Sequence, residues 1–225
     1  LEMTGKPYAS PAFTRLAKKI FKTLRDHCYE ASSDLAKEKG SFPLYDADLY
    51  PKGSFIKTLS PHVREKIELN GIRNSHLLSI APTGTISITA DNVSSGIEPP
   101  YSLQMDRTVQ SFDGPQVVRV EDYAYKQGVK GRTANEISAQ EHVSVLALAS
   151  KYIDSAVSKT CNVGDDVSYE DFKDLYLTAW KSGCKGITTF RAAGKRFGIL
   201  NEVKDEEPKA EACYIDPNTG LRECE

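Results

Sequence analysis

The chain has 225 residues, of which 40% are hydrophobic and 27% charged, an ordinary globular composition. No run approaches the roughly 18 to 20 apolar residues that a membrane span needs, and residues 1–10 are too short and polar for a signal peptide. A net charge of −2 does not suit direct nucleic-acid binding, and five cysteines at low density favour a reducing compartment such as the cytoplasm.

Negative charge is concentrated at the C-terminal end. Residues 201–225 hold eight acidic and three basic side chains, a net charge of −5 against −2 for the whole chain. Few of them are large and apolar, so we expect a flexible acidic tail over 201–225 and a folded part over 1–200. The chain begins with Leu1 and an amphipathic pattern follows almost at once, which indicates a piece of a longer protein.

The first part of the chain predicts two helices. Apolar residues recur every three or four positions over 13–35, which predicts a helix with one buried stripe that Gly40 ends. Cys28 lies on that stripe, so we expect it to be an inert core thiol. Residues 41–61 are typical of a loop, and a short helix is predicted over 61–69.

Strands and helices alternate in the remainder. The apolar run 77–80 predicts a buried strand closed by Pro82, and 101–110 predicts a second strand. Residues 117–126 are compatible with a short helix. Because short buried strands alternate with amphipathic helices, the pattern predicts an α/β fold.

Two later helices have distinct start signals. Ser138 with Glu141 forms a capping box ahead of an apolar face. Ser168 with Asp171 predicts a second helix start of the same kind. Residues 185–191, rich in Ile and Thr, predict the last strand.

The strongest chemical signal is residues 79–87, Ser-Ile-Ala-Pro-Thr-Gly-Thr-Ile-Ser. A strand runs into a turn where Gly84 lets the backbone approach a ligand, and successive N–H groups and hydroxyls suit a phosphate. The alternative is a tight turn that binds nothing, because the glycines and lysine of the known phosphate loops are absent. Residues 91–100, taken alone, are typical of a solvated connection.

Cys213 and Cys224 differ from the other cysteines. They lie in the tail on either side of a turn signal at 216–220, which would bring the two thiols together. Such a pair suits a dithiol–disulfide carrier, with two unrelated tail cysteines as the alternative. Cys161 and Cys184 are expected to be buried.

No metal site is predicted. A structural zinc site needs about four ligands, and the tail offers one pair of cysteines. The four histidines show no ligand spacing and are expected to be structural or surface residues: His27, His62, His76 and His142.

Taken together, five blocks in order resemble the C-terminal portion of the ribonucleotide reductase large chain. The resemblance is closest to the adenosylcobalamin-dependent class II enzyme. The blocks are residues 79–87, 92–99 (Asn-Val-Ser-Ser-Gly-Ile-Glu-Pro), 154–162 (Asp-Ser-Ala-Val-Ser-Lys-Thr-Cys-Asn), 180–191 and the cysteine-containing tail.

The resemblance implies the C-terminal part of a ten-stranded α/β barrel. It also implies roles for individual residues. The family's phosphate-binding turn matches Pro82, Thr83, Gly84, Thr85 and Ile86. The family's C-terminal cysteines, which re-reduce the active-site disulfide, match Cys213 and Cys224.

The implied reaction is the thiyl-radical reduction of ribonucleotides to deoxyribonucleotides for DNA synthesis, with adenosylcobalamin as cofactor. The implied partners are the ribonucleotide substrate, a thioredoxin- or glutaredoxin-type reductant, and the missing N-terminal portion as the same chain or a separate subunit. Since the family's Asn-x-Cys-x-Glu radical loop is absent, we expect this chain alone to be inactive.

Two alternatives remain at this level. In class I large chains the corresponding late strand carries adjacent tyrosines that relay a radical from a metal-containing small subunit. Residues 188–191 hold Thr-Thr-Phe-Arg instead, which favours class II over class I. The other alternative is a non-catalytic phosphate-binding module or redox adaptor.

Overall fold

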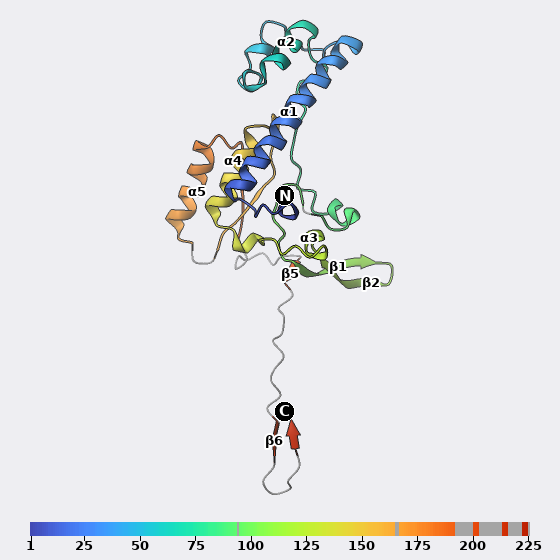
Figure 1. Ribbon diagram of the computed structural model, residues 1–225, viewed down its shortest axis with the longest axis vertical. Helices are drawn as coiled ribbons and strands as arrows, with labels where there is room; N and C mark the ends of the chain where they lie inside the picture. Colours follow the sequence, from blue (N-terminus) through green and yellow to red (C-terminus); the bar gives the residue numbers. More distant parts are fainter. Residues whose placement is uncertain (94, 165–166, 192–199, 203–212, 216–221, 225) are drawn as a thin grey trace.

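The computed structural model describes residues 1–93, 95–164, 167–191, 200–202, 213–215 and 222–224 (Figure 1). Most of the expected tail therefore lies outside the described residues. No helix within the described ranges is long and apolar enough to cross a membrane.

The described residues form five α-helices and seven strands. The helices are α1 (Pro11–Lys39), α2 (Pro61–Asn70), α3 (Tyr123–Lys126), α4 (Ala139–Ser150) and α5 (Tyr169–Lys181). The strands are β1 (Gln104–Ser111), β2 (Gly114–Glu121), β3 (Thr160–Asn162), β4 (Thr188–Phe190), β5 (Leu200–Glu202), β6 (Cys213–Ile215) and β7 (Arg222–Cys224). Short 3₁₀ helices are η1 (Glu2–Thr4), η2 (Tyr50–Lys52), η3 (Ile56–Thr58), η4 (Ile86–Ala90) and η5 (Ala134–Glu136).

The first predicted helix is confirmed as α1, which is capped at both ends. The Ser10 hydroxyl accepts a hydrogen bond from the Phe13 N–H at 3.1 Å, and Pro11 suits the first helical position. Gly40 ends the helix with a φ of 79°, a conformation that favours glycine. The second helix is confirmed as α2, and Figure 1 shows it packed at the far end of α1.

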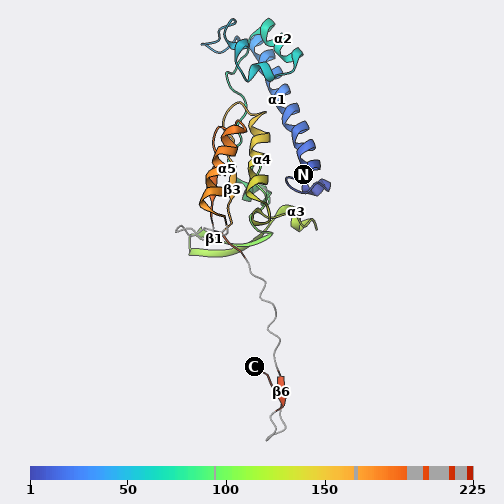
Figure 2. The ribbon, with the colours of Figure 1, turned by 90° about the vertical axis from the view of Figure 1, so that its left-hand side faces the viewer.

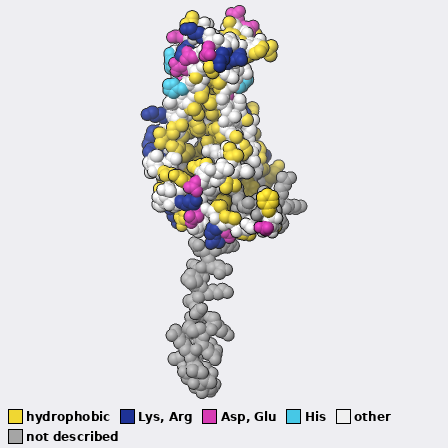
Figure 3. Space-filling view, turned by 90° about the vertical axis from the view of Figure 1, so that its right-hand side faces the viewer, with side chains coloured by type: hydrophobic (Ala, Val, Ile, Leu, Met, Phe, Trp, Pro, Cys, Tyr) yellow, Lys and Arg dark blue, Asp and Glu magenta, His cyan; other side chains and the backbone are white. Residues whose placement is uncertain are grey.

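The expected apolar stripe of α1 is wrong near the middle of the helix. Ile20 and Leu24 are 45% and 48% exposed, whereas Arg25, Asp26 and Tyr29 are buried. The polar residues are buried because neighbouring groups satisfy them. Arg25 and Asp26 form an ion pair at 2.7 Å, for example. Figure 3 shows hydrophobic side chains gathered on the face of the molecule that lies to the right in Figure 1.

Cys28 was expected in the core and is only half-buried, because the predicted stripe does not face the segments that pack against this part of α1. The core at this end forms instead around Tyr29, with apolar side chains of the 3₁₀ turns and α2. Its buried members are Tyr29, Ile56, Leu59, Val63, Ile67 and Ile72.

The parallel strands confirm the α/β class. β3 leads through α5 into β4, and the two strands pair in parallel with Cys161 opposite Thr189. Such a connection requires a crossover, which α5 provides. Figure 2 shows α4 and α5 side by side next to β3. Both helix-start predictions are confirmed, since Ser138 and Ser168 each accept a hydrogen bond from the N–H three residues later.

The strand predicted over 77–80 forms only a single bridge, between Ile80 and Val157. The segment is nevertheless extended and lies parallel to residues 155–158. The Ile80 N–H donates to the Ala156 carbonyl at 3.0 Å, and the Ser158 N–H donates to the Ile80 carbonyl at 2.8 Å. Too few residues pair for a regular strand.

The helix predicted over 117–126 is wrong for most of its length. Residues up to Glu121 belong to β2, which pairs antiparallel with β1, and only α3 is helical. The β-branched Val117, Val118 and Val120 favour the strand. The other edge of β1 pairs with β5, so the strand expected over 101–110 is confirmed as the centre of a three-stranded sheet.

Candidate functional site

One cavity of about 440 Å³ collects segments that are far apart in the sequence. We call it the central cavity. The turn at 82–86, the loop at 92–99, β3 and β4 all contribute to its wall. Its lining residues are Gly84, Ser87, Asn92, Val93, Ser95, Glu98, Pro99, Pro100, Tyr101, Ser102, Met105, Asp122, Ala134, Thr160, Asn162, Thr188, Thr189 and Phe190.

The turn predicted to bind phosphate borders this cavity through Gly84. Pro82, Thr85 and Ile86 are exposed and are not among the lining residues, and Thr83 is half-buried. Thr83 has a φ of 47°, a left-handed conformation that is uncommon for a threonine and occurs often at functional sites.

Hydroxyl groups meet at this end of the cavity. The Ser87 hydroxyl donates to the Gly84 carbonyl at 3.1 Å and lies 3.5 Å from the Ser95 hydroxyl. After the turn, the chain enters η4. Because Ser87 donates its hydroxyl hydrogen to Gly84, the Ser95 hydroxyl is the neutral side-chain donor of this pair that can turn to a ligand.

The loop at 92–99 is packed against the turn and is not a solvated connection. Gly96 has a φ of 59°, and a Cβ at this position would lie 2.8 Å from the Ala81 carbonyl oxygen. Only glycine allows both the backbone conformation and this approach. At Gly84, by contrast, a Cβ would meet nothing nearer than the Ser95 hydroxyl at 4.0 Å. The fold therefore requires glycine at position 96 and leaves Gly84 free to face a ligand.

Glu98 ties the loop to β3 through a buried ion pair. The Lys159 Nζ donates to Glu98 Oε2 at 2.6 Å, and the Thr160 N–H donates to the other carboxylate oxygen. The Lys159 side chain is 0% exposed, and its ammonium also donates to the Thr160 carbonyl and to His142 Nδ1. Three acceptors therefore match the three N–H bonds of a charged lysine.

His142 is the neutral member of this cluster. Its Nε2 lies 3.1 Å from the Ala134 carbonyl, which can only accept, so Nε2 carries the proton and Nδ1 accepts from Lys159. Burial, reinforced by the Lys159 charge, lowers the pKa of His142 to about 4. The histidine is structural, in agreement with the sequence.

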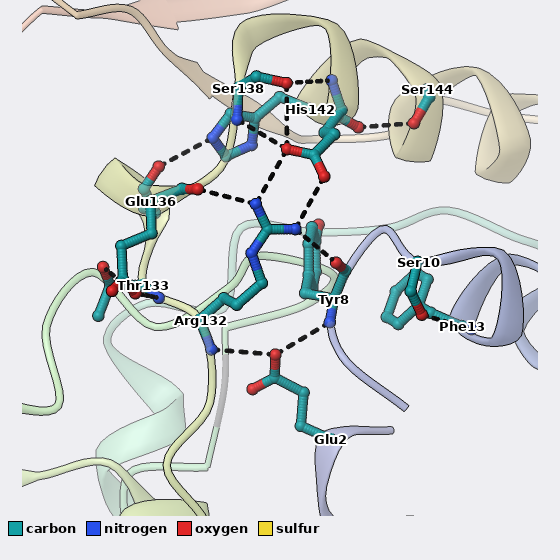
Figure 4. A network of polar contacts seen from close by, with 12 residues as sticks. Glu2, Tyr8, Ser10, Phe13, Arg132, Thr133, Glu136, Ser138, His142 and Ser144 are labelled. Atoms are coloured by element: carbon teal, nitrogen blue, oxygen red, sulfur yellow. Dashed lines mark hydrogen bonds and ion pairs between the residues drawn. The ribbon is translucent and has the colours of Figure 1, made fainter. Parts of the chain in front are cut away.

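A second polar network holds the N-terminal segment against the start of α4 (Figure 4). The Arg132 guanidinium makes two hydrogen bonds to the Glu141 carboxylate at 2.8 and 3.0 Å, which lower the pKa of Glu141 to about 2. The Glu2 carboxylate accepts hydrogen bonds from the backbone N–H groups of Arg132 and Tyr8. The Tyr8 hydroxyl then donates to the Ile97 carbonyl at 2.6 Å, which supports the loop at 92–99.

Cys161 and Cys184 are not activated thiols. Cys161 lies on β3, fully buried, and burial raises its pKa to about 11. Burial also raises the pKa of the half-buried Cys184. In the tail, β6 and β7 pair antiparallel with Cys213 directly opposite Cys224. The predicted turn at 216–220 lies outside the described residues.

The volume of the central cavity bears on the size of the ligand that it can hold. A cavity of about 440 Å³ suits one small ligand such as a nucleotide. In the part of the chain that the structure describes, no group of three or more His, Cys, Asp or Glu residues could hold a metal ion.

Comparison with known proteins assigns these segments. A family model described as the ribonucleotide reductase barrel domain matches residues 1–190. This chain belongs to that family. The residues that line the central cavity are therefore barrel-domain residues of a ribonucleotide reductase.

Curated relatives agree with this assignment. A vitamin B12-dependent ribonucleoside-diphosphate reductase of Mycobacterium tuberculosis is 28% identical over 240 residues, 94% of this chain and 32% of the relative. A reductase of the same name from Thermoplasma acidophilum is 31% identical and covers 91% of this chain and 28% of the relative. The ribonucleoside-diphosphate reductase subunit alpha of Mycoplasma pneumoniae is 26% identical, with 92% and 33% covered. The chain thus spans about a third of the length of these relatives.

Glu98, Lys159 and Gly96 had no predicted role. All three nevertheless lie inside motifs that resemble the family, at 92–99 and 154–162. A usable signal was present in the second motif, because a lysine beside a buried β-strand requires a partner of opposite charge. The partner lies 61 residues away in the sequence, and only the fold identifies it.

The pKa of His142 makes stability depend on pH. In the unfolded chain the imidazole takes up a proton near its ordinary value of 6.5, whereas the folded protein keeps it neutral down to about 4. The free energy of unfolding is therefore expected to be highest above pH 6.5 and to fall by up to about 3 kcal/mol between pH 6.5 and 4. Urea unfolding at a series of pH values measures this slope.

His142→Gln removes the titrating group, so the slope between pH 6.5 and 4 is expected to become smaller. His62→Gln, at an exposed histidine, is the matched control and should keep the slope of the wild type. An unchanged slope in His142→Gln would contradict the assignment.

Proposed function

We propose that this chain forms part of the substrate site of a ribonucleotide reductase, the enzyme that converts ribonucleotides into deoxyribonucleotides for DNA synthesis. The observation that carries the proposal is the convergence of four separated segments on one cavity of nucleotide size. A tight turn without a ligand would not require a second loop, β3 and β4 at the same place.

The turn at 82–86 would hold the substrate's phosphates. Its backbone at Gly84 is exposed to the cavity, and the hydroxyls of Ser87 and Ser95 lie within 4 Å of each other beside it. Backbone N–H groups and hydroxyls of this kind bind phosphate oxygens without a neighbouring cation. Pro82, Thr83, Thr85 and Ile86 would shape the turn.

Residues 1–200 would belong to a ten-stranded barrel and residues 201–225 to a reducing tail. The parallel arrangement of 77–80, 155–162 and β4 supports the barrel. The apolar residues that α1 exposes, Ile20 and Leu24 among them, suit a surface that the rest of the barrel covers, either in the same chain or as a separate subunit.

The tail dithiol of Cys213 and Cys224 would regenerate the active site by thiol–disulfide exchange. One thiolate attacks the active-site disulfide, the second resolves the mixed disulfide, and the two active-site thiols are released as the tail disulfide forms. A thioredoxin- or glutaredoxin-type reductant then returns two electrons to the tail. The register that sets Cys213 opposite Cys224 supports their action as a pair.

The radical would be generated by adenosylcobalamin bound to the complete, cytoplasmic enzyme. Residues 188–191 place Thr188, Thr189 and Phe190 at the cavity, without the adjacent tyrosines of a class I relay. The B12-dependent relatives support the same subclass. The cofactor supplies the radical chemistry, and this chain's residues bind and orient the substrate.

Reconstitution tests the function. The chain is combined with the portion of the barrel that carries the radical-cysteine loop, and deoxyribonucleotide formation is measured with adenosylcobalamin or with a class I small subunit. We expect activity with adenosylcobalamin and none with the chain alone. Activity that requires the small subunit would place the protein in class I, and no activity with either would favour an adaptor.

Gly84→Val tests the phosphate turn. The fold has room for a side chain at this position, so the substitution should leave stability nearly unchanged. It should weaken binding of a ribonucleoside diphosphate about tenfold, the loss of roughly one hydrogen bond to a charged group. Gly186→Val is the matched control, because a Cβ there also meets open space. Equal affinities in both variants would contradict the role.

Cys213→Ser tests the tail. In the complete enzyme it should abolish multiple turnover with a thioredoxin-type reductant and preserve a single turnover, because the active-site thiols start out reduced. Cys28→Ser, on α1, serves as the control and should retain steady-state activity. An undiminished steady-state rate in Cys213→Ser would rule out the tail as the reductant.

A further inference from the structure

The charge balance of the central cavity requires an explanation. Among the described residues that line it, two are acidic, Glu98 and Asp122, and none is lysine or arginine. Asp122 caps α3, where its carboxylate accepts from the Tyr125 N–H at 3.2 Å. Glu98 is the acidic residue beside the hydroxyl-rich turn. A phosphate ligand there would meet a carboxylate, and like charges in a partly buried site repel strongly.

Lys159 neutralises the Glu98 carboxylate from a position outside the lining of the cavity. It does not line the cavity, its side chain is wholly buried, and its ammonium lies 2.6 Å from Glu98. His142 and the Thr160 carbonyl accept its other two N–H groups, which holds the ammonium in one position. The pair as a whole carries no net charge.

We propose that Lys159 is a positioning residue for an anionic ligand of the central cavity: it neutralises Glu98, so that a diphosphate group can bind the turn at 82–86. The inference rests on the proposed function for the identity of the ligand, a ribonucleoside diphosphate. Its electrostatic part rests on the geometry alone. Lys159 acts through Glu98 and does not touch the ligand.

A purely structural ion pair predicts different behaviour. If the pair only fastened the loop to β3, removal of either partner would loosen the loop and weaken binding to a similar extent. If the pair sets the charge of the cavity, the two substitutions have opposite signs. Loss of Lys159 leaves an unbalanced carboxylate, whereas loss of Glu98 leaves an unbalanced ammonium that attracts phosphate.

The experiment measures dissociation constants in the protein assembled with the rest of the barrel. The ligands are a ribonucleoside diphosphate and inorganic pyrophosphate, and the variants are Lys159→Met, Glu98→Gln and the double variant. Lys173→Met, an exposed lysine paired with Glu170 on α5, is the control. We expect Lys159→Met to weaken both ligands about tenfold, Glu98→Gln to bind at least as tightly as the wild type, and the double variant to recover to within about threefold.

Comparable losses in Lys159→Met and Glu98→Gln, or no loss in Lys159→Met, would overturn the inference. Should Lys159→Met fail to fold, the comparison of Glu98→Gln with the double variant still tests the inference. Glu98→Gln keeps Lys159 and must bind both ligands more tightly than the double variant. Wild-type protein that binds pyrophosphate and not the ribonucleotide would refute the proposed function alone. Wild-type protein that binds neither would refute both.

Discussion

The buried ion pair between Lys159 and Glu98 is the contact on which the site depends. It joins a loop at 92–99 to β3, and the same loop presses Gly96 against the turn at 82–86. Burial of a lysine is costly unless its charge is balanced and its N–H groups are accepted, and here both conditions are met. The walls of the cavity are therefore fixed relative to one another.

The segment 154–162 contacts α1 through its first residue and the wall of the central cavity through its last residues. Asp154 accepts hydrogen bonds from the Tyr29 hydroxyl at 2.6 Å and from the backbone N–H groups of Leu77 and Leu78. These bonds anchor α1 and the extended segment 77–80. At the other end, residues 159–162 hold the loop and pair with β4. A single stretch of nine residues thus positions three of the four segments around the cavity.

Local signals in the sequence were sufficient for α1, α2, α4 and α5. The hydroxyls of Ser10, Ser138 and Ser168 cap α1, α4 and α5, because a cap is formed by residues three apart and needs no distant partner. The strand β2 was missed since periodicity alone does not separate a short helix from an alternating strand, and its partner β1 settled the matter.

Burial on α1 shows where local reasoning fails. The sequence pattern favours Leu24 for the core, yet Arg25 and Asp26 are buried because residues 58–60 bring a threonine and a serine to meet them. No periodicity carries that information. An amphipathic stripe identifies a helix, but the partner surface decides which face is covered.

The sequence by itself determined the presence of α1, α2, α4 and α5, the α/β class, the five motif blocks and the family to which they point. Only the tertiary structure decided that four of the segments meet at one cavity, that Gly96 and not Gly84 is required by the fold, and that Lys159 balances Glu98. The physical reason is the separation along the chain of the groups that interact. Caps and periodicity act over three or four residues, whereas charge balance and backbone packing join groups that are distant in the chain and close only after folding.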